Sequence, residues 1–207
     1  MQAGPDNSLI APLVERACAT IRDHEAELTE LDRAIGDGDH GVNMRRGFEA
    51  IAAQRAELQA LDFWPAVQKA GTILVMRVGG ASGPLYGSLL MAMGKAEGGL
   101  AERFAAGVAA VKSRGKSDIG AKTMLDVLVP VQQALAAGAT PAALRAIAAE
   151  AAAATLPMRA SKGRASFLGE RSVGHVDPGA RSAELLIAMA CDLAENPMQA
   201  APMEKSS

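Results

Sequence analysis

Apolar side chains recur at helical spacing along almost the whole chain, and this pattern restricts the fold more than any other feature. Alanine is abundant and favours helix, whereas β-branched residues never cluster in the alternating runs that are typical of strands. About eight amphipathic stretches account for the pattern, and no convincing strand interrupts them. The sequence therefore predicts an all-α bundle.

The expected helices begin at residues that favour a helix start. Ser8, Asp62, Thr140 and Asp177 each precede a periodic stretch as candidate caps, and Pro84 stands in a first turn, where proline is tolerated. The stretches cover residues 9–35, 41–58, 63–74, 84–93, 100–111, 123–135, 141–154 and 178–193. No linker divides the chain, so residues 1–207 are expected to form a single domain with residues 1–7 and 196–207 frayed.

Charge and composition exclude several classes of protein. The formal net charge is −2 and the basic residues are dispersed, so no basic stripe indicates nucleic acid. No apolar run is long enough to cross a bilayer, and the first ten residues lack the features of a signal peptide. Cys18 and Cys191 lie far apart in apolar helical contexts, which favours free thiols over a disulfide. These features predict a cytoplasmic protein that binds neither nucleic acid nor membrane.

Three partial motifs do not have the context that their function requires. Residues 36–41 match the glycine spacing of a dinucleotide-binding loop, but no strand precedes them, and two carboxylates in the loop would repel a pyrophosphate without a cation. Residues 115–117 resemble the end of a P-loop, yet Ala110 replaces its first glycine. An EF-hand beginning at Asp37 would need glutamate where Phe48 stands.

The densest chemical feature is the acidic stretch from Leu31 to Met44. Asp32 lies near the end of the first expected helix, and Asp37 and Asp39 lie in the glycine-rich turn that follows. Alternate residues of such a turn can direct two carboxylates to one point, and the helix end supplies a third. Three hard oxygen ligands suit Mg²⁺ better than zinc, and Mg²⁺ usually completes its shell with phosphate oxygens. The stretch predicts a magnesium site for a phosphorylated ligand.

The alternative is that Asp37 or Asp39 only caps the second helix, which is a common role for an aspartate at that position. Capping explains one carboxylate and leaves two unexplained. Without a cation, three converging carboxylates would also raise one another's pKa.

Two further helix starts are candidate anion sites. Residues 79–84 (GGASGP) lead into a helix whose free backbone N–H groups could bind a phosphate, although Ser82 could equally act as a simple cap. Asp177 and Pro178 open the last helix, for which capping is the better reading of the pair alone. The preceding loop, residues 159–177, is long and rich in polar residues, and such loops are more often functional than idle. Its basic residues either meet phosphates or solvate the loop; they are Lys162, Arg164 and Arg171. His40 stands beside the acidic turn, and His175 stands beside the helix start at Asp177 and Pro178.

Taken together, these segments resemble the L-subunit family of dihydroxyacetone kinases. Four stretches carry the resemblance in the same order: residues 28–48, 79–87, 122–130 and 156–180. The resemblance implies a closed barrel of about eight antiparallel amphipathic helices with the nucleotide site at one end. One departure is Ala121, at a position where the family often has an acidic residue.

The resemblance also implies the ligands. Asp32, Asp37 and Asp39 would hold two Mg²⁺ ions against the phosphates of ADP or ATP. Leu85 and Met124 are candidates to flank the adenine. The implied nucleotide contacts are His40, Gly41, Val42, Asn43, Ala81, Ser82, Gly115, Thr123, Met124, Arg164, Asp177, Pro178 and Gly179.

In this family the hydroxyketone is bound by a separate K-type subunit or domain, which this sequence does not contain. The chain is thus similar to a detached L subunit: a phosphotransferase acting on an alcohol group only with its partners, with no catalytic residue of its own assigned. Such subunits keep ADP, which a phosphohistidine carrier of the sugar phosphotransferase system recharges. Two alternatives stay open, namely an ATP-using kinase subunit for another ketose such as a tetrulose, and a nucleotide-responsive binding module without catalysis. A homodimer also stays open.

Overall fold

The computed structural model describes residues 5–196, and in this range it contains ten α-helices, two 3-10 helices and no strand. The all-α prediction is confirmed for these residues. In chain order the elements are η1 (Asn7–Leu9), α1 (Ile10–Asp23), α2 (Glu25–Ile35), α3 (His40–Ala53), α4 (Arg55–Gln59), α5 (Phe63–Arg77), α6 (Ser82–Lys95), α7 (Leu100–Gly115), α8 (Leu125–Ala136), α9 (Pro141–Ala154), η2 (Arg164–Ser172) and α10 (Pro178–Glu195).

The expected number of helices was too low because two of the expected helices are each divided by one residue. His24 ends α1 at φ −107°, and Gln54 ends α3 at φ −104°, both outside helical geometry. The apolar face continues across each break, so periodicity alone does not detect it. Of the tails expected to be frayed, residues 1–4 and 197–207 lie outside the described part. Within it, Asp6 rather than Ser8 is the first cap, because its carboxylate accepts the backbone N–H of Ser8 at 3.0 Å.

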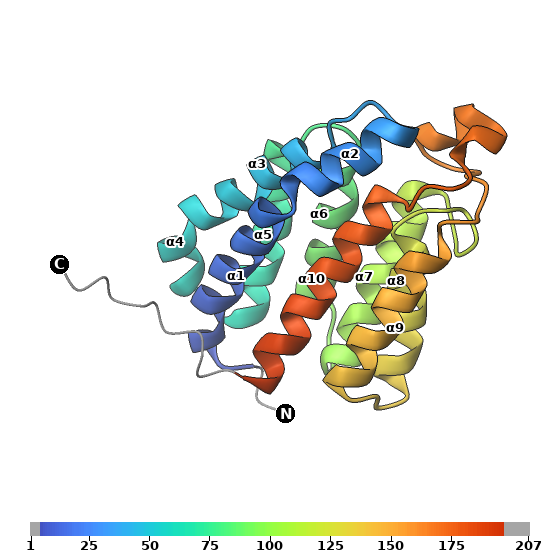
Figure 1. Cartoon of the computed structure of the whole chain (residues 1–207). Helices are drawn as coiled ribbons and strands as arrows, with labels where there is room; N and C mark the ends of the chain where they lie inside the picture. The colour runs from blue at the N-terminus through green and yellow to red at the C-terminus, as the bar shows by residue number, and fades with distance from the viewer. Residues whose placement is uncertain (1–4, 197–207) are drawn as a thin grey trace.

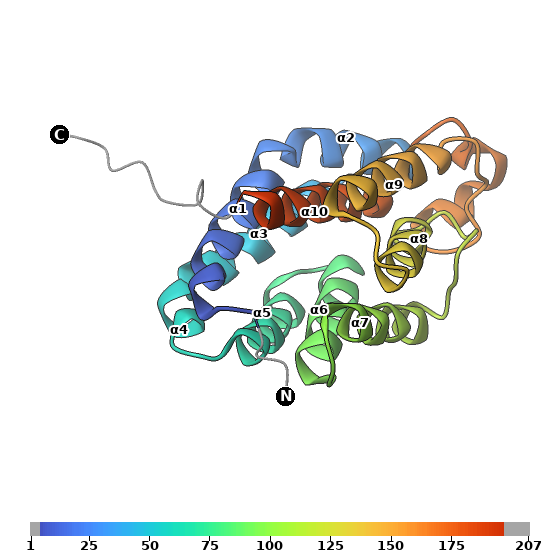
Figure 2. The same ribbon diagram turned by 90° about the horizontal axis from the view of Figure 1, so that it is seen from below.

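The helices form a ring in which each long helix packs against its neighbours. Each helix contacts the next one in the order α1, α3, α5, α6, α7, α8, α9 and α10. Helix α10 also packs against α1, which closes the ring. Figure 2 shows α5, α6 and α7 on one side and α2, α9 and α10 on the other. Helices α1 and α2 run on in the same direction from η1, and α10 runs back, so η1 and the end of α10 lie at one end of the bundle, whereas the α2–α3 turn lies at the other (Figure 1). We call this second end the turn end.

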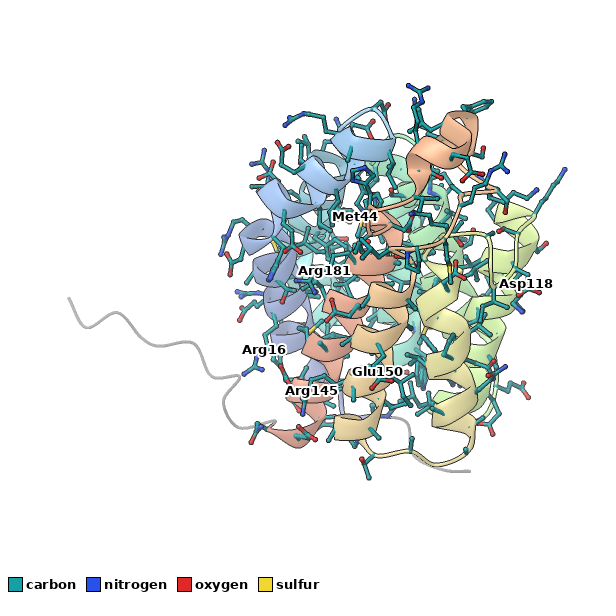
Figure 3. The ribbon with its side chains drawn as sticks, turned by 45° about the vertical axis from the view of Figure 1, so that its right-hand side comes forward. Arg16, Met44, Asp118, Arg145, Glu150 and Arg181 are labelled. Atoms are coloured by element: carbon teal, nitrogen blue, oxygen red, sulfur yellow. The ribbon has the colours of Figure 1, made fainter. Side chains whose placement is uncertain are left out.

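Apolar side chains fill the interior of the ring. Ile21, Val111 and Val127 have no exposed surface, and Leu28 is equally enclosed. Charged side chains such as Arg145 and Glu150 lie on the outside (Figure 3). Within residues 5–196, no helix has both the length and the apolar character that a membrane crossing requires.

The two cysteines are Cys18, which is partly exposed, and Cys191, which is buried. Both are free thiols, as the sequence predicts.

A second, smaller apolar cluster lies outside the ring at the turn end. Ile35 at the end of α2 packs with Ala160 and Ala165, and Leu168 covers them. This cluster attaches η2 to α2, and Figure 1 shows η2, in orange, beyond the end of α2. The long loop expected at residues 159–177 is therefore an ordered segment with its own packing.

Helices α5 and α6 approach so closely that glycine is required between them. A Cβ atom added to Gly71 would lie 2.7 Å from the carbonyl oxygen of Gly87 and 2.8 Å from the backbone nitrogen of Met91. Both are backbone atoms of α6, so the helices would have to separate to admit a side chain.

We expect Gly71→Ala to lower the free energy of unfolding by about 1–3 kcal/mol, the range typical of an overpacked core. Denaturant unfolding followed by circular dichroism measures the change. Thr72→Ala alters the next, exposed position of α5 and should stay within about 0.5 kcal/mol of the parent chain. Equal stability of the two variants would contradict the close helix contact.

Candidate functional site

The turn between α2 and α3 brings three carboxylates together. Asp32 lies in the last turn of α2, and Asp37 and Asp39 follow in the turn, where Gly38 has a φ of +73° that favours glycine. One oxygen atom from each carboxylate lies within 4.8 Å of the others. A Cβ atom at Gly36 would lie 2.1 Å from Oδ1 of Asp32, so glycine at this position leaves room for that carboxylate.

The capping role at the start of α3 belongs to Asp32. Its Oδ2 atom accepts the backbone N–H groups of Asp39 at 2.8 Å and of His40 at 3.1 Å. Asp39 is the N-cap residue by position but makes no side-chain cap hydrogen bond. The carboxylates of Asp37 and Asp39 are thus not used as caps of α3.

Arg164 reaches this cluster from η2. Its guanidinium forms an ion pair with Oδ2 of Asp37 at 2.8 Å. One positive charge therefore already faces the three carboxylates, and the same contact ties η2 to the α2–α3 turn.

A pocket of about 160 Å³ lies beside the aspartates. It is formed by the α2–α3 turn, the N-terminal ends of α6 and α10, the segment before α8, and η2. Its lining residues are Asp32, Ile35, Asp37, Asp39, His40, Gly80, Ala81, Ser82, Leu85, Tyr86, Lys122, Thr123, Met124, Lys162, Gly163, Arg164, Ala165, Asp177, Pro178 and Gly179.

Most residues expected in the site line this pocket, but six do not. Gly41 packs against the backbone of α2, since an added Cβ would lie 2.2 Å from the carbonyl oxygen of Glu25. The Asn43 amide oxygen accepts a hydrogen bond from Arg46. Gly115 faces Leu85, whose Cδ2 would lie 3.5 Å from an added Cβ. The other three are exposed and outside the lining: Val42, Arg171 and His175.

A buried chain of hydrogen bonds joins three helices behind the aspartates. The His40 ring bonds through Nδ1 to the Ser82 hydroxyl and through Nε2 to the Ser182 hydroxyl, each at 2.9 Å. Tyr86 bonds to Ser182 at 2.7 Å. Burial lowers the pKa of His40 and raises that of Tyr86, so both side chains favour their neutral forms. Ser82 therefore orients His40 instead of capping α6, where no side-chain cap bond is present.

Lys122 is a pocket residue that sequence reasoning did not select. Only 1 % of it is exposed, and its φ of +61° is unusual for a residue with a side chain. Its ammonium group donates to the carbonyl oxygens of Met158 at 3.0 Å and Ser172 at 2.6 Å. Lys122 thus fastens the segment that carries η2. No sequence signal indicates this, because an isolated lysine usually lies on the surface.

Asp126 holds the backbone of the loop before α8. Its carboxylate accepts the N–H groups of Gly120 and of Thr123, the latter at 2.7 Å. Ala121, the departure from the family pattern, is buried, and its carbonyl oxygen accepts the N–H of Ser161 at 3.2 Å. The loop before α8 is thus hydrogen-bonded to the segment that leads into η2.

Asp177 caps α10, as expected, by accepting the N–H of Ala180 at 2.7 Å. Burial raises the pKa of Asp177 to about 7, with the nearby Asp126 carboxylate adding to the shift, whereas the Ala180 hydrogen bond and Lys122 oppose it. Pro178 and Gly179 follow in the first turn and line the pocket.

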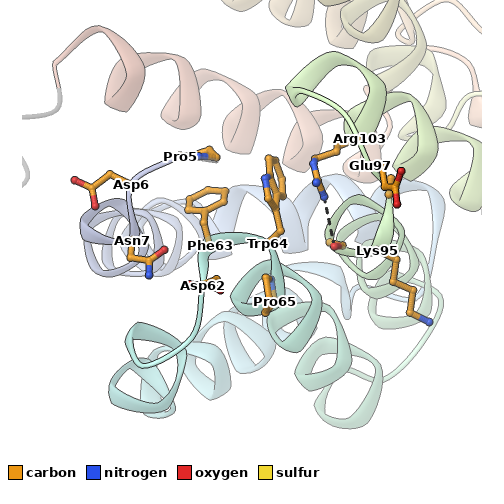
Figure 4. A pocket seen from close by; sticks show the side chains of 12 residues that line it. Pro5, Asp6, Asn7, Asp62, Phe63, Trp64, Pro65, Lys95, Glu97 and Arg103 are labelled. Atoms are coloured by element: carbon orange, nitrogen blue, oxygen red, sulfur yellow. Dashed lines mark hydrogen bonds between the residues drawn. The ribbon is translucent and has the colours of Figure 1, made fainter. Parts of the chain in front are cut away.

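A larger cavity of about 730 Å³ lies at the opposite end of the bundle (Figure 4). One of its polar groups, Arg103, is already engaged: it stacks 4.3 Å from the ring centre of Trp64 and donates to the carbonyl oxygen of Gly98 at 2.9 Å. The described groups that could hold a metal ion are instead those of the aspartate pocket. The smaller pocket is therefore the better candidate for chemistry.

Comparison with known proteins identifies the family of the chain. The model of the DAK2 domain family matches residues 34–192. The ADP-binding subunit DhaL of PEP-dependent dihydroxyacetone kinase 1 from Listeria innocua is 43% identical over 178 residues, which cover 80% of this chain and 86% of that protein. The ADP-binding subunit DhaL of the Escherichia coli PEP-dependent dihydroxyacetone kinase is 42% identical, covering 83% of this chain and 90% of that one.

The fold is similar to part of a solved kinase structure. The dihydroxyacetone kinase from C. freundii in complex with AMP-PNP and Mg²⁺ superposes with a TM-score of 0.74 at 28% identity. The match covers 92% of this chain but only 34% of that one, so the chain spans about a third of the length of that kinase.

We expect Lys122→Met to lower the free energy of unfolding by about 2–3 kcal/mol, because two buried carbonyl groups lose a charged donor. Chemical denaturation measures the loss. Lys112→Met removes a partly exposed ion pair with Asp118 and should cost at most about 1 kcal/mol. If both lysine variants were equally stable, the buried hydrogen bonds of Lys122 would not be stabilising.

Asp177 should make stability depend on pH. Its pKa in the folded chain is about 7, against 3.8 for the unperturbed group, so the folded state retains a proton that the unfolded state releases between about pH 4 and 7. The stability of the wild-type chain relative to Asp177→Asn should then fall by up to about 1.4 kcal/mol per pH unit in this window and stay constant above it. Thermal or urea unfolding of the nucleotide-free proteins at several pH values measures the difference. A difference that does not vary with pH would contradict the raised pKa.

Proposed function

The chain belongs to the DAK2 domain family, and on this basis we propose that it is the ADP- and Mg²⁺-binding subunit of a dihydroxyacetone-type kinase. The observation that supports this most directly is the convergence of Asp32, Asp37 and Asp39 beside a pocket lined by helix N-termini. Converging carboxylates suit a metal ion, and helix N-termini suit a phosphate group.

The donor set fits magnesium. Asp32 has one carboxylate oxygen bound by backbone amides and the other directed to the space that Gly36 leaves open. Asp37 and Asp39 are free of capping bonds with α3. We propose that these three residues hold the Mg²⁺ of the nucleotide, with two ions as the family resemblance implies. When bound, Mg²⁺ neutralises charge on the phosphates during transfer.

The remaining residues of the pocket suit a nucleotide. The N-terminal ends of α6 and α10 direct backbone N–H groups towards it through Ala81, Ser82 and Gly179, which favours anionic phosphates. We assign the other phosphate and ribose contacts to the expected residues of the lining, and the adenine to the side of Leu85 and Met124.

Arg164 has a double role in this proposal. At about 160 Å³ the pocket is smaller than the roughly 300–1,000 Å³ typical of small-molecule sites. The Arg164–Asp37 ion pair lies in the lining of this pocket. Binding of Mg²⁺ to Asp37 would release the guanidinium, which then lies near enough to bind phosphate.

We further propose that the phosphoryl group passes to a hydroxyketone held by a K-type partner subunit, so that this chain supplies the donor and positions it. A phosphohistidine carrier of the phosphotransferase system is the proposed source of the phosphoryl group, because the relatives named above are subunits of PEP-dependent kinases. The acceptor is assigned to the dihydroxyacetone class on the same ground. The free thiols of Cys18 and Cys191 fit a cytoplasmic location.

We expect Asp37→Ala to weaken ADP binding in the presence of Mg²⁺ by more than the roughly 10–100-fold loss typical of changes in outer-shell partners of a metal. Isothermal titration of the purified chain with ADP, with and without Mg²⁺, measures the effect. Asp23→Ala removes an exposed carboxylate at the end of α1 and should leave the affinity unchanged. A wild-type chain that does not bind ADP with Mg²⁺ would refute the proposal.

A further inference from the structure

Exposed apolar side chains gather at the turn end of the bundle. The described residues include eight large hydrophobic side chains that are exposed, and only Leu100, at the start of α7, belongs to the opposite end. The other seven lie at helix ends or in connections of the turn end: Val42, Val75, Met76, Ile119, Leu156, Phe167 and Val173. The exposed apolar side chains are thus concentrated at the end of the bundle that carries the pocket, and exposed apolar surface is a feature of protein–protein contacts.

Phe167 is the most exposed of these residues, with 89 % of its surface open to solvent. It lies in η2, three residues after Arg164, whose guanidinium reaches Asp37 at the pocket. Its neighbours in the segment behave differently, because Ala165 is buried and Leu168 packs onto the small cluster around Ile35. Phe167 is therefore presented by a segment that is packed on its other side.

The segment that carries Phe167 is held in place from both ends. Ser172 is fully buried; its hydroxyl donates to the carbonyl oxygen of Gly169 at 2.6 Å and accepts the N–H of Ala160 at 2.9 Å. Lys122 binds the carbonyl oxygens of Met158 and Ser172. Fixed backbone on either side reduces the entropy lost when a partner covers the aromatic ring.

The surroundings of Phe167 are basic. The segment contains Arg159, Lys162, Arg164 and Arg171 but only one acidic residue, Glu170. Arg159 pairs with Glu170, and Arg164 pairs with Asp37 of the α2–α3 turn, which leaves the segment with an excess of positive charge. An aromatic side chain surrounded by basic groups fits a partner surface with an apolar recess and an acidic rim.

We propose that Phe167 is an anchor that docks the subunit carrying the hydroxyketone against the mouth of the pocket. This inference rests on the proposed function, since it assumes that the transferred phosphoryl group leaves through this mouth. The acceptor-bearing subunit is the better occupant than a phosphocarrier, because the C. freundii kinase contains a similar domain as about a third of one chain. The same docking surface would serve a kinase in one chain and a kinase made of separate subunits.

The test compares Phe167→Ala and Phe167→Leu with Leu100→Ala, an exposed apolar residue of the opposite end. Binding to the purified hydroxyketone-binding subunit is measured by surface plasmon resonance with ADP and Mg²⁺ present. We expect Phe167→Ala to weaken this complex about 30-fold or more, as for an aromatic hot spot. Phe167→Leu should recover most of the affinity, and Leu100→Ala should stay within about twofold.

Phosphoryl transfer separates docking from chemistry. With Phe167→Ala the rate should fall at limiting partner concentration and return to the wild-type value at saturation, while the affinity of the isolated chain for ADP stays unchanged. Wild-type affinity of Phe167→Ala for the subunit, with ADP binding intact, would overturn the inference and leave the proposed function standing. Weakened binding of the phosphocarrier alone would overturn it as well. If the wild-type chain did not bind ADP in the presence of Mg²⁺, the proposed function itself would be overturned.

Discussion

The structure of the site depends on the carboxylate of Asp32 and the two backbone amides that it accepts at the start of α3. One oxygen atom, carried by the last turn of α2, caps the start of α3 and so ties the two helices together. The other oxygen atom is left on the pocket side, where Gly36 has no side chain to cover it. Because Asp32 caps the helix, Asp37 and Asp39 do not have to. The structural task of capping α3 thus falls to one of three identical side chains, and the other two carboxylates are not used for it.

Behind this turn, the pocket is supported by groups that are neutral or internally paired. His40 connects the hydroxyls of Ser82 and Ser182, and thereby the starts of α3 and α6 with α10. On the other side, Lys122 and Asp126 hold two loops by backbone hydrogen bonds. Arg181, labelled in Figure 3, adds an ion pair to Glu27 at 2.6 Å that joins α10 to α2. Among these supporting groups, none pairs with the carboxylates of the turn; the positive charge that does so is Arg164 of η2.

Sequence patterns predicted the helical class and the convergence of the three aspartates well, because both depend on local spacing. The aspartates lie within a stretch of eight residues, and the glycines that shape their turn lie among them. Patterns failed where a long-range contact decides the outcome. The burial of Lys122 depends on Met158 and Ser172, and the division of the long helices at His24 and Gln54 leaves their apolar faces unchanged. The role of Ser82 was also ambiguous, since its partner His40 is 42 residues away in sequence.

The direction of the helices has a consequence for how such a domain can be joined to others. The first described residues and the end of α10 lie at the end of the bundle opposite the aspartate turn (Figure 1). Helix α10 has 18 residues and is therefore about 27 Å long. A covalent tether starting from its end has to run back along the bundle, which takes at least about eight extended residues, before it reaches the pocket. A domain fused to the end of α10 therefore needs this extra length of chain, whereas a separate subunit needs none. In both cases the turn end of the bundle can face the partner.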